Sequence, residues 1–226
     1  GIEVISLQMK WYSQGRIIRK LGRQITDFQP DLVHAMLYRA MEYTRMACAG
    51  KKVKLITTPH FDFSKKSVIL RWIDRLLKEL DTLTVAESFA TARYLVEKQK
   101  YAKQKVYLLP NGADPSFFFP DRSLRNHMRS RYGFTEENTV FLSVARLAPV
   151  KNPILLLQAF RNVWQRDSSV RLVYVGEGPE RSKLAEYIRL YQLEESVWLA
   201  GEQTDINSWL NMADVFVLPS VEESLP

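Results

Sequence analysis

The sequence predicts an α/β fold with two domains, each built on a parallel β-sheet covered by helices. Short β-rich runs alternate with longer amphipathic runs along the chain, which is the pattern of parallel strands joined by helical crossovers. A cluster of turn-forming residues, Pro110–Pro115, interrupts the alternation, and a second series of the same kind begins at Thr139. We therefore expect one domain over residues 1–117, and a linker with a second domain over residues 118–226.

The first series contains several runs whose composition favours β-structure. We expect strands at Ile2–Leu7, Asp31–His34, Lys54–Thr58, Thr82–Ala86 and Val106–Leu109. Between them, apolar residues recur at helical spacing. We expect helices at Tyr12–Phe28, after His34 as far as Ala49, at Val68–Leu80 and at Phe89–Gln99.

The first of these helices carries two stripes at the same spacing. One is apolar and comprises Ile18, Leu21, Ile25 and Phe28. The other is basic and comprises Arg16, Arg19, Lys20 and Arg23. A basic amphipathic helix of this kind fits a membrane surface, and it equally fits a helix that covers a sheet and turns its charged face to water. The sequence leaves both interpretations open.

The second series repeats the pattern after a charged segment, 115–138, in which we place the domain connection. We expect strands at Val140–Val144, Arg171–Val175, Val197–Ala200 and Val215–Leu218. We expect helices at Pro153–Arg166, Glu180–Tyr191 and Ile206–Met212. Each strand is followed by a distinctive loop, and in a parallel sheet these loops meet at the carboxyl edge, where open α/β folds bind ligands.

Composition and charge exclude several classes of protein. The chain has 226 residues, 46% of them hydrophobic, with 9 Gly and 10 Pro, which indicates a folded protein. No apolar stretch approaches the roughly 18 residues needed to span a bilayer. The single cysteine, Cys48, cannot form an internal disulfide, and we expect it to be buried in a helix. We therefore expect a cytoplasmic protein, with peripheral attachment to the cytoplasmic face of a membrane as an option.

The net charge of +7 is distributed unevenly. Residues 1–110 hold 20 Lys/Arg and 10 Asp/Glu, giving +10, whereas residues 111–226 hold 12 and 15, giving −3. A cationic half suits an anionic partner such as a phospholipid surface or a lipid-phosphate acceptor. An ordinary lysine-rich solvated surface explains it equally well, and no recognition motif supports binding of nucleic acid.

The loops of the second series carry the residues best suited to chemistry. Arg146 and Lys151 lie five positions apart, between a buried strand and a helix that begins with proline, so both could reach one anion. Fixed positive charge of this kind stabilises a diphosphate leaving group as negative charge develops on it. The turn Gly176-Glu177-Gly178-Pro179 could bring backbone amides close to a phosphate or sugar. Taken alone, it is a tight turn between a strand and a helix.

Two further loops complete the set. In Gly201–Asp205, either Thr204 or Asp205 is placed to cap the next helix. The terminal run Pro219-Ser220-Val221-Glu222-Glu223 puts two carboxylates beyond the last strand, where one could accept hydrogen bonds from sugar hydroxyls. Each loop taken alone also has an ordinary structural explanation.

In this order, the four strand-to-loop units closely resemble the donor-binding domain of the family 4 group of retaining glycosyltransferases. The family shows a Ser-x-Gly-Arg-Leu-x(3)-Lys-Asn segment, a Gly-Asp/Glu-Gly-Pro turn, a Gly-x(3)-Asp loop and a Pro-Ser-x-x-Glu-Gly ending. The resemblance covers about Val140–Pro226, and Asn111-Gly112-Ala113-Asp114 is similar to the family's hinge. Ala145 and Ser224 stand where the family usually has glycine.

The resemblance implies a GT-B type fold, with two Rossmann-like domains that we expect to be incomplete in this chain. It implies transfer of a sugar from a nucleotide-diphosphate-sugar donor to a lipid or glycan hydroxyl, with retention of the anomeric configuration. Arg146 and Lys151 would hold the donor diphosphate, and Glu223 would contact the donor sugar. Gly176, Gly178 and Asp205 would also line the donor site. No metal or other cofactor is expected, because the two cations take the place of a metal.

In the first half, Thr57-Thr58-Pro59-His60 resembles the family's Thr-x-His segment, so His60 is a candidate catalytic residue that would hydrogen-bond the donor sugar or the acceptor. The basic half favours a lipid-linked or polysaccharide acceptor. Two alternatives remain open: a non-catalytic nucleotide-binding or scaffold fragment with the same fold, and a sugar-nucleotide epimerase. The epimerase would need further acid/base carboxylates.

Overall fold

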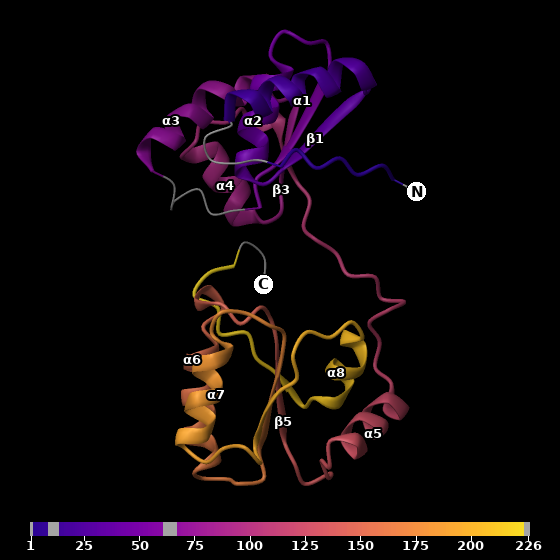
Figure 1. Cartoon of the computed structure of the whole chain (residues 1–226), viewed down its shortest axis with the longest axis vertical. Helices are drawn as coiled ribbons and strands as arrows, with labels where there is room; N and C mark the ends of the chain where they lie inside the picture. Colours follow the sequence, from indigo (N-terminus) through magenta and orange to yellow (C-terminus); the bar gives the residue numbers. More distant parts are fainter. Residues whose placement is uncertain (1, 9–13, 61–66, 224–226) are drawn as a thin grey trace. The chain divides into compact units, whose positions relative to one another are not determined.

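The computed structural model describes residues 2–8, 14–60 and 67–223, which form two compact units (Figure 1). The division falls between Asn111 and Gly112, whereas the sequence-based boundary lies between residues 117 and 118. The hinge-like run that begins at Asn111 therefore marks the change of unit.

The first unit is a four-stranded parallel sheet with helices between its strands. Its elements are α1 (Gln14–Phe28), β1 (Leu32–Met36), α2 (Tyr38–Cys48), β2 (Lys54–Thr58), α3 (Val68–Leu77), η2 (Lys78–Leu80), β3 (Leu83–Ala86), α4 (Phe89–Glu97), η3 (Lys103–Lys105) and β4 (Val106–Leu108). The strands follow the order β1-β2-β3-β4, with Val33 opposite Leu55 and Thr84 opposite Val106. The predicted strands and helices after residue 30 are present, with small shifts at their ends.

One prediction for the start of the chain is wrong. Ile2–Leu7 forms no strand, and it pairs with none of the strands in the described part of the chain; Ile2 and Val4 are almost fully exposed. A β-rich composition gives a strand only where a neighbouring edge supplies hydrogen bonds. The predicted helix is present as α1; Ile17 and Ile25 are buried in it, whereas Phe28 at its end is 79% exposed. Residues 12 and 13 of the predicted helix lie outside the described residues.

Polar contacts hold the interior of the first unit together alongside an apolar core. The fully buried Arg45 donates to Asp81 (Nε to Oδ1, 2.8 Å), to Asp74 (2.7 Å) and to the Tyr101 hydroxyl (2.8 Å). These contacts join α2, α3 and the start of β3 around one guanidinium group. Because a buried charge is stable only when it is paired and hydrogen-bonded, this network fixes where α3 docks.

The second unit is a parallel sheet with the order β7-β6-β5-β8. Its elements are α5 (Arg122–Arg131), β5 (Val140–Val144), η4 (Pro149–Lys151), α6 (Pro153–Trp164), β6 (Arg171–Val175), α7 (Arg181–Leu190), β7 (Val197–Leu199), α8 (Ile206–Met212) and β8 (Val215–Phe216). The chain first builds outward from β5 to β6 and β7, and then returns to the other side of β5 with β8. This reversal is a topological switch point.

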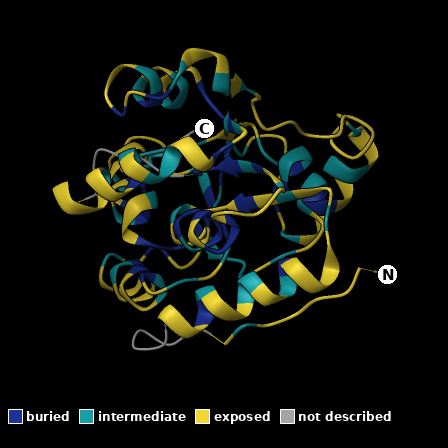
Figure 2. Ribbon diagram, turned by 90° about the horizontal axis from the view of Figure 1, so that it is seen from above, coloured by how far each residue is buried: buried dark blue, intermediate teal, exposed yellow. Residues whose placement is uncertain are grey.

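Alternate residues of the central strands face two different apolar clusters. Leu172 and Tyr174 of β6 pack with residues of α6 and α7, whereas Val173 and Val175 pack with residues of α5 and α8. The side-chain period of two along a strand therefore gives a sheet between two helical layers. Figure 2 shows the buried residues concentrated on the strands and on the inward faces of helices.

Helix α5 lies in the segment that the sequence predicted as a connection. Its sequence is mostly charged and polar, so an apolar stripe does not reveal it. Asp121 caps it by accepting from Ser123 and Leu124 N–H, and Met128 packs against α8.

Among the described residues, none of the helices combines the length and the apolar character that crossing a bilayer requires.

Candidate functional site

Four loops of the second unit meet at the carboxyl edge of its sheet. They follow β5, β6, β7 and β8, and because all four strands are parallel, the loops lie at the same edge. The predicted residues Arg146, Gly176, Gly178 and Glu223 belong to these loops, and Lys151 lies in the short helix η4 after β5. The edge on either side of β5 is the switch point, where open α/β sheets place their ligand sites.

The loop that carries Arg146 packs directly on the predicted glycine turn. Ala145 N–H donates to Val175 O (3.0 Å), and Leu147 N–H donates to Glu177 O (2.8 Å). A Cβ at Gly176 would lie 2.1 Å from Ala145 O, and a Cβ at Gly178 would lie 2.4 Å from Leu147 O. Both glycines have φ values that side-chain-bearing residues rarely adopt, +137° and +157°. They therefore allow the close approach that positions Arg146.

This packing gives the two glycines a role that differs from the predicted phosphate contact. The Gly176 N–H already donates to Gly201 O (2.7 Å), so that amide is engaged inside the protein. The glycine turn thus joins the loops after β5, β6 and β7 into one structure. A contact between Gly176 or Gly178 and a bound donor stays a prediction.

Lys151 and Glu223 were predicted as separate contacts for a ligand, and the structure brings them together. Lys151 Nζ forms an ion pair with Glu223 Oε1. A backbone bond from Val221 N–H to Val150 O (2.9 Å) ties the two segments beside this pair. Both side chains are partly exposed, at 26% and 20%, so they remain accessible to a small molecule.

The electrostatic environment of Glu223 follows from this pairing. Partial burial by itself would raise the pKa of the Glu223 carboxyl, but the Lys151 ammonium beside it outweighs that effect and lowers the pKa below its ordinary value. Glu223 is therefore ionised at neutral pH, and both of its oxygens act as hydrogen-bond acceptors.

Arg146 is exposed at the end of β5, and its side chain makes no hydrogen bond or ion pair with another described residue. Asp205, in contrast, has hydrogen-bond partners within the protein. Its two carboxylate oxygens accept from Ser208 N–H (3.2 Å) and Ser208 Oγ (2.5 Å), which makes it the cap of α8. The cap is thus confirmed, and a contact between Asp205 and a donor stays a prediction.

His60 belongs to the first unit and lies just after the end of β2. Its backbone has φ of 44°, in the left-handed region, and its Nδ1 contacts Glu87 Oε2. The Glu87 side chain is 3% exposed and follows β3 directly, while the His60 ring is 25% exposed. The carboxylate fixes the ring orientation. If Nδ1 carries the proton, Nε2 is left as an acceptor.

Sequence reasoning missed Glu87. A usable signal was present, because Glu87 follows a predicted strand at the edge that also bears His60. Its Oε1 is buried without a hydrogen-bond partner among the described residues, which is an unusual condition for a carboxylate. Within those same residues, no group of three or more His, Cys, Asp or Glu side chains could hold a metal ion.

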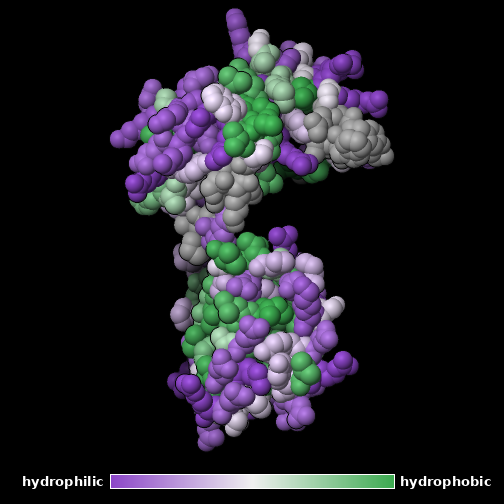
Figure 3. Space-filling model, turned by 90° about the vertical axis from the view of Figure 1, so that its left-hand side faces the viewer, coloured by the Kyte–Doolittle hydropathy of each residue, from purple (hydrophilic) through white to green (hydrophobic). Residues whose placement is uncertain are grey.

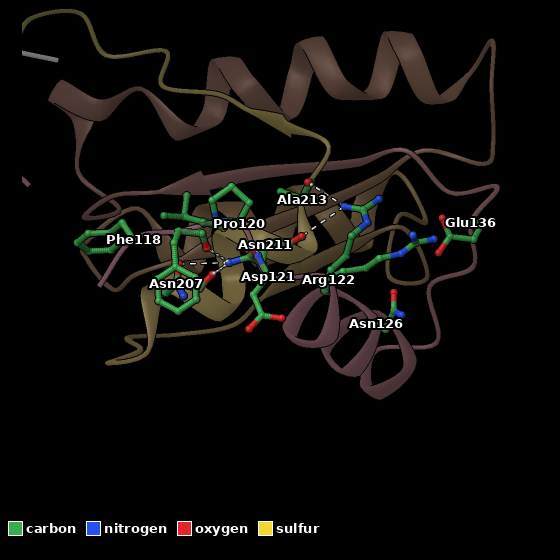
Figure 4. Close-up of a pocket in the computed structure, with 12 residues that line it drawn as sticks. Phe118, Pro120, Asp121, Arg122, Asn126, Glu136, Asn207, Asn211 and Ala213 are labelled. Carbon is green, nitrogen blue, oxygen red and sulfur yellow. Dashed lines mark hydrogen bonds between the residues drawn. The ribbon is translucent and has the colours of Figure 1, made fainter. Parts of the chain in front are cut away.

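A pocket of about 750 Å³ lies elsewhere in the second unit, between the start of α5 and α8 (Figure 4). Its polar groups bond one another: Asn211 accepts from Asp121 N–H (2.6 Å) and donates to Phe119 O (3.0 Å). Arg125 donates to Ala213 O (3.1 Å). These bonds fasten the segment before α5 to α8, and none of the predicted site residues lines this pocket.

The sequence matches two family models that together cover most of the chain. Residues 2–117 match the model of Glycosyltransferase Family 4, and residues 125–226 match that of Glycosyl transferases group 1. The chain therefore belongs to family 4 of the glycosyltransferases, and its two parallel sheets form the GT-B fold of that family.

Curated relatives agree with this membership. The chain is 30% identical to the putative glycosyltransferase EpsF of Bacillus subtilis over 163 residues, 69% of this chain and 42% of that protein. It is 27% identical over 207 residues to an Escherichia coli UDP-Gal:alpha-D-GlcNAc-diphosphoundecaprenol alpha-1,3-galactosyltransferase, 87% of this chain and 53% of that protein. The chain spans about half the length of these relatives.

Solved structures show the same fold. Anabaena HepE, in a complex with UDP and glucose, matches with a TM-score of 0.81 at 21% identity, over 97% of this chain and 61% of that one. Sucrose-phosphate synthase from Thermosynechococcus elongatus matches with a TM-score of 0.79 at 16% identity, over 99% of this chain and 58% of that one. At these identities the similarity establishes the fold alone.

Proposed function

We propose that the protein containing this chain transfers a sugar from a nucleotide-diphosphate-sugar donor to an acceptor hydroxyl, with retention of the anomeric configuration. The observation that carries the proposal is the placement of Arg146 and the Lys151–Glu223 pair at the switch point of the second sheet. Two cations and one carboxylate at that edge suit a ligand with a diphosphate and a hydroxylated sugar.

Each residue has a proposed role that follows from its environment. Arg146 has no partner in the described structure, so it is available to bind the donor diphosphate. Lys151 would share its charge between that diphosphate and Glu223, and Glu223 would accept hydrogen bonds from the donor sugar. As the glycosyl bond breaks, negative charge grows on the diphosphate, and both cations stabilise it more strongly than in the ground state.

We propose that this transfer needs no metal ion or other cofactor, because Arg146 and Lys151 supply the positive charge. For retention, we favour attack on the same face, assisted by the leaving phosphate. Activity that survives exhaustive treatment with EDTA would support the first part. The anomeric configuration of the first product, read by proton NMR, tests the second, and an inverted product would refute it.

For the acceptor, we propose a lipid-linked or glycan hydroxyl. Support comes from the names of two relatives, the diphosphoundecaprenol-linked galactosyltransferase and a Salmonella typhimurium lipopolysaccharide 1,2-N-acetylglucosaminetransferase that is 27% identical over 152 residues. Another relative, from Bacillus anthracis, is named N-acetyl-alpha-D-glucosaminyl L-malate synthase, so small acceptors belong in the same assay. Transfer only to a small soluble acceptor would overturn this choice.

The first experiment is a thermal-shift measurement with UDP, GDP and ADP. We expect one nucleotide to raise the Tm and Arg146→Ala to abolish the shift, because a lost charge-assisted contact weakens binding about 10- to 100-fold. Arg189→Ala, which removes an exposed cation at the end of α7, is the matched control and should respond like the wild type. If the folded protein responds to none of the three, the non-catalytic scaffold becomes the better interpretation.

A further inference from the structure

An ion pair between Glu177 and Arg181 belongs to the loops that form the candidate donor site. Glu177 is the second residue of the glycine turn after β6, and Arg181 is the first residue of α7. Arg181 Nη1 donates to Glu177 Oε1 (2.9 Å). The roles proposed for Arg146, Lys151 and Glu223 leave both of these side chains unassigned.

Glu177 contacts the loops on both sides of its own. Its backbone oxygen accepts from Leu147 N–H (2.8 Å), in the loop that carries Arg146. Its side chain reaches the loop after β7, because a Cβ at Gly201 would lie 3.2 Å from Glu177 Oε1. Whatever fixes the position of Glu177 therefore helps to fix the loops after β5, β6 and β7 relative to one another.

Arg181 extends the same connection to the end of β7. Its Nη2 donates to Leu199 O (3.4 Å), while Nη1 binds the Glu177 carboxylate. One planar guanidinium group thus joins the turn after β6 to the neighbouring strand, because its donors point in fixed, different directions. In the described sheet β7 is an edge strand that pairs with β6 alone, so the sheet supports the loop after β7 from one side. Arg181 adds support from outside the sheet.

Arg181 stands where a helix disfavours a cation. The first turn of a helix carries partial positive charge, so an arginine there is unfavourable unless other contacts compensate. The side chains of Arg181 and Glu177 are 40% and 46% exposed, and an ion pair at such a surface contributes little to global stability. Figure 3 views the side of the second unit on which α6 and α7 lie, and it shows many hydrophilic side chains there. We therefore expect the pair to act on the positions of the loops, and not on the stability of the fold.

We propose that Arg181 is a positioning residue of the donor site, which acts through Glu177 on the loop that carries Arg146. This role rests on the proposed function, in which Arg146 binds the donor diphosphate. A hydrogen bond weakens steeply as its angle departs from linear, so a small shift of this loop is enough to weaken the contact between Arg146 and a phosphate. Arg181 itself touches no part of the donor in this role.

The first test measures the loops themselves, without any ligand. Gly176 N–H donates to Gly201 O (2.7 Å), so this amide reports on the contact between the loops after β6 and β7. In Arg181→Gln, hydrogen exchange at the Gly176 amide should be about three- to tenfold faster, at an unchanged Tm. The matched control is Arg93→Gln, which removes an exposed i,i+4 ion pair with Glu97 in the first unit and should leave this exchange rate unchanged.

The second test measures nucleotide binding by isothermal titration calorimetry. Arg181→Gln should weaken binding of UDP, GDP or ADP, whichever the wild type binds, by about three- to tenfold. In an Arg146→Ala protein the same change should have almost no further effect, because two residues that act through one contact give non-additive losses. Arg181→Lys keeps the charge but cannot bridge Glu177 and Leu199, so we expect its affinity to stay reduced.

Four results would overturn the role of Arg181 while leaving the proposed function intact. The first is normal exchange at the Gly176 amide in Arg181→Gln, and the second is normal nucleotide binding by that variant. The third is an equal loss from Arg181→Gln in the wild-type and Arg146→Ala proteins, which would mean that Arg181 acts independently of Arg146. The fourth is full recovery of affinity in Arg181→Lys, which would reduce its part to charge alone. A folded wild type that binds none of the three nucleotides would instead refute the proposed function, and this role with it.

Discussion

Lys151 and Glu223 form an ion pair although they are 72 positions apart in the sequence. The pair joins the loop after β5 to the segment after β8, at the switch point of the second sheet. A diphosphate and a sugar bound there would lie next to each other, because the cation and the carboxylate that suit them are already in contact. The pair therefore predicts different responses to a nucleotide and to its sugar derivative.

Lys151→Ala is expected to weaken binding of the nucleoside diphosphate and of the nucleotide-sugar alike, by about 10- to 100-fold. Glu223→Gln is expected to weaken the nucleotide-sugar only, since the diphosphate alone makes no use of the carboxylate. Isothermal titration calorimetry with both ligands checks this. Lys183→Ala, which removes a surface lysine that is 68% exposed, is the control. Equal losses in both variants for both ligands would refute the division of roles.

Gly176→Ala is expected to destabilise the protein by about 1–3 kcal/mol and to abolish the nucleotide-induced thermal shift. A Cβ there would lie 2.1 Å from Ala145 O, so the loop that carries Arg146 must move. Gly15→Ala is the control, because a Cβ at Gly15 meets no atom within 4 Å. A Gly176→Ala protein with normal Tm and normal nucleotide response would show that the loop adapts at no cost.

Much of this site could be predicted from the sequence, and the missed parts have physical reasons. The strands Lys54–Thr58, Val140–Val144 and Arg171–Val175 have the predicted bounds, since each is a β-rich run in a parallel sheet. Ile2–Leu7 has a similar composition but no neighbouring strand in the described structure. Local pattern reports what a segment can form, whereas pairing decides what it does form.

The contacts between distant residues were not predictable in the same way. Nothing in the run around Lys151 indicates that it pairs with Glu223, and nothing around Asp74 indicates that it faces Arg45. The sequence indicates the glycine turn after β6. The reason for its glycines is the close approach of the backbone of the loop after β5, which only the structure shows. These contacts depend on how several elements pack together. The local pattern of a single sequence holds no information on that packing.

Asp214→Asn is expected to lower stability at pH 7 by about 1–2 kcal/mol, because the Asp214 side chain is 29% exposed and solvent screens its ion pairs. Asp214 accepts from Val140 N–H (2.7 Å), Arg125 (2.6 Å) and Arg129 (3.1 Å), and Arg129 is itself 3% exposed. Burial alone would raise the pKa of Asp214, but these donors outweigh it and lower that pKa.

The sign of the pH dependence follows from this direction. A carboxyl group whose pKa is depressed in the folded state contributes its full stability above its unfolded pKa, about 3.9 for Asp. That contribution disappears as the pH falls through the folded-state pKa. Urea denaturation of both proteins from pH 7 downward should therefore show curves that converge in acid. A difference that is constant with pH would contradict the ionic explanation.

Glu87→Gln tests whether Glu87 acts as a positioning residue for His60, on the proposal that His60 serves the transfer reaction. The Glu87 carboxylate contacts His60 Nδ1 and fixes the ring orientation, so its loss should lower kcat about tenfold while the nucleotide-induced thermal shift, which reports on the second unit, is unchanged. His60→Ala should lower kcat further. Glu97→Gln, which alters an exposed carboxylate on α4, is the matched control. A purely structural loss would reduce the Tm and the nucleotide-induced thermal shift together, so a fall in kcat, Tm and thermal shift would refute the positioning role. A normal kcat would refute any role of Glu87 in the reaction.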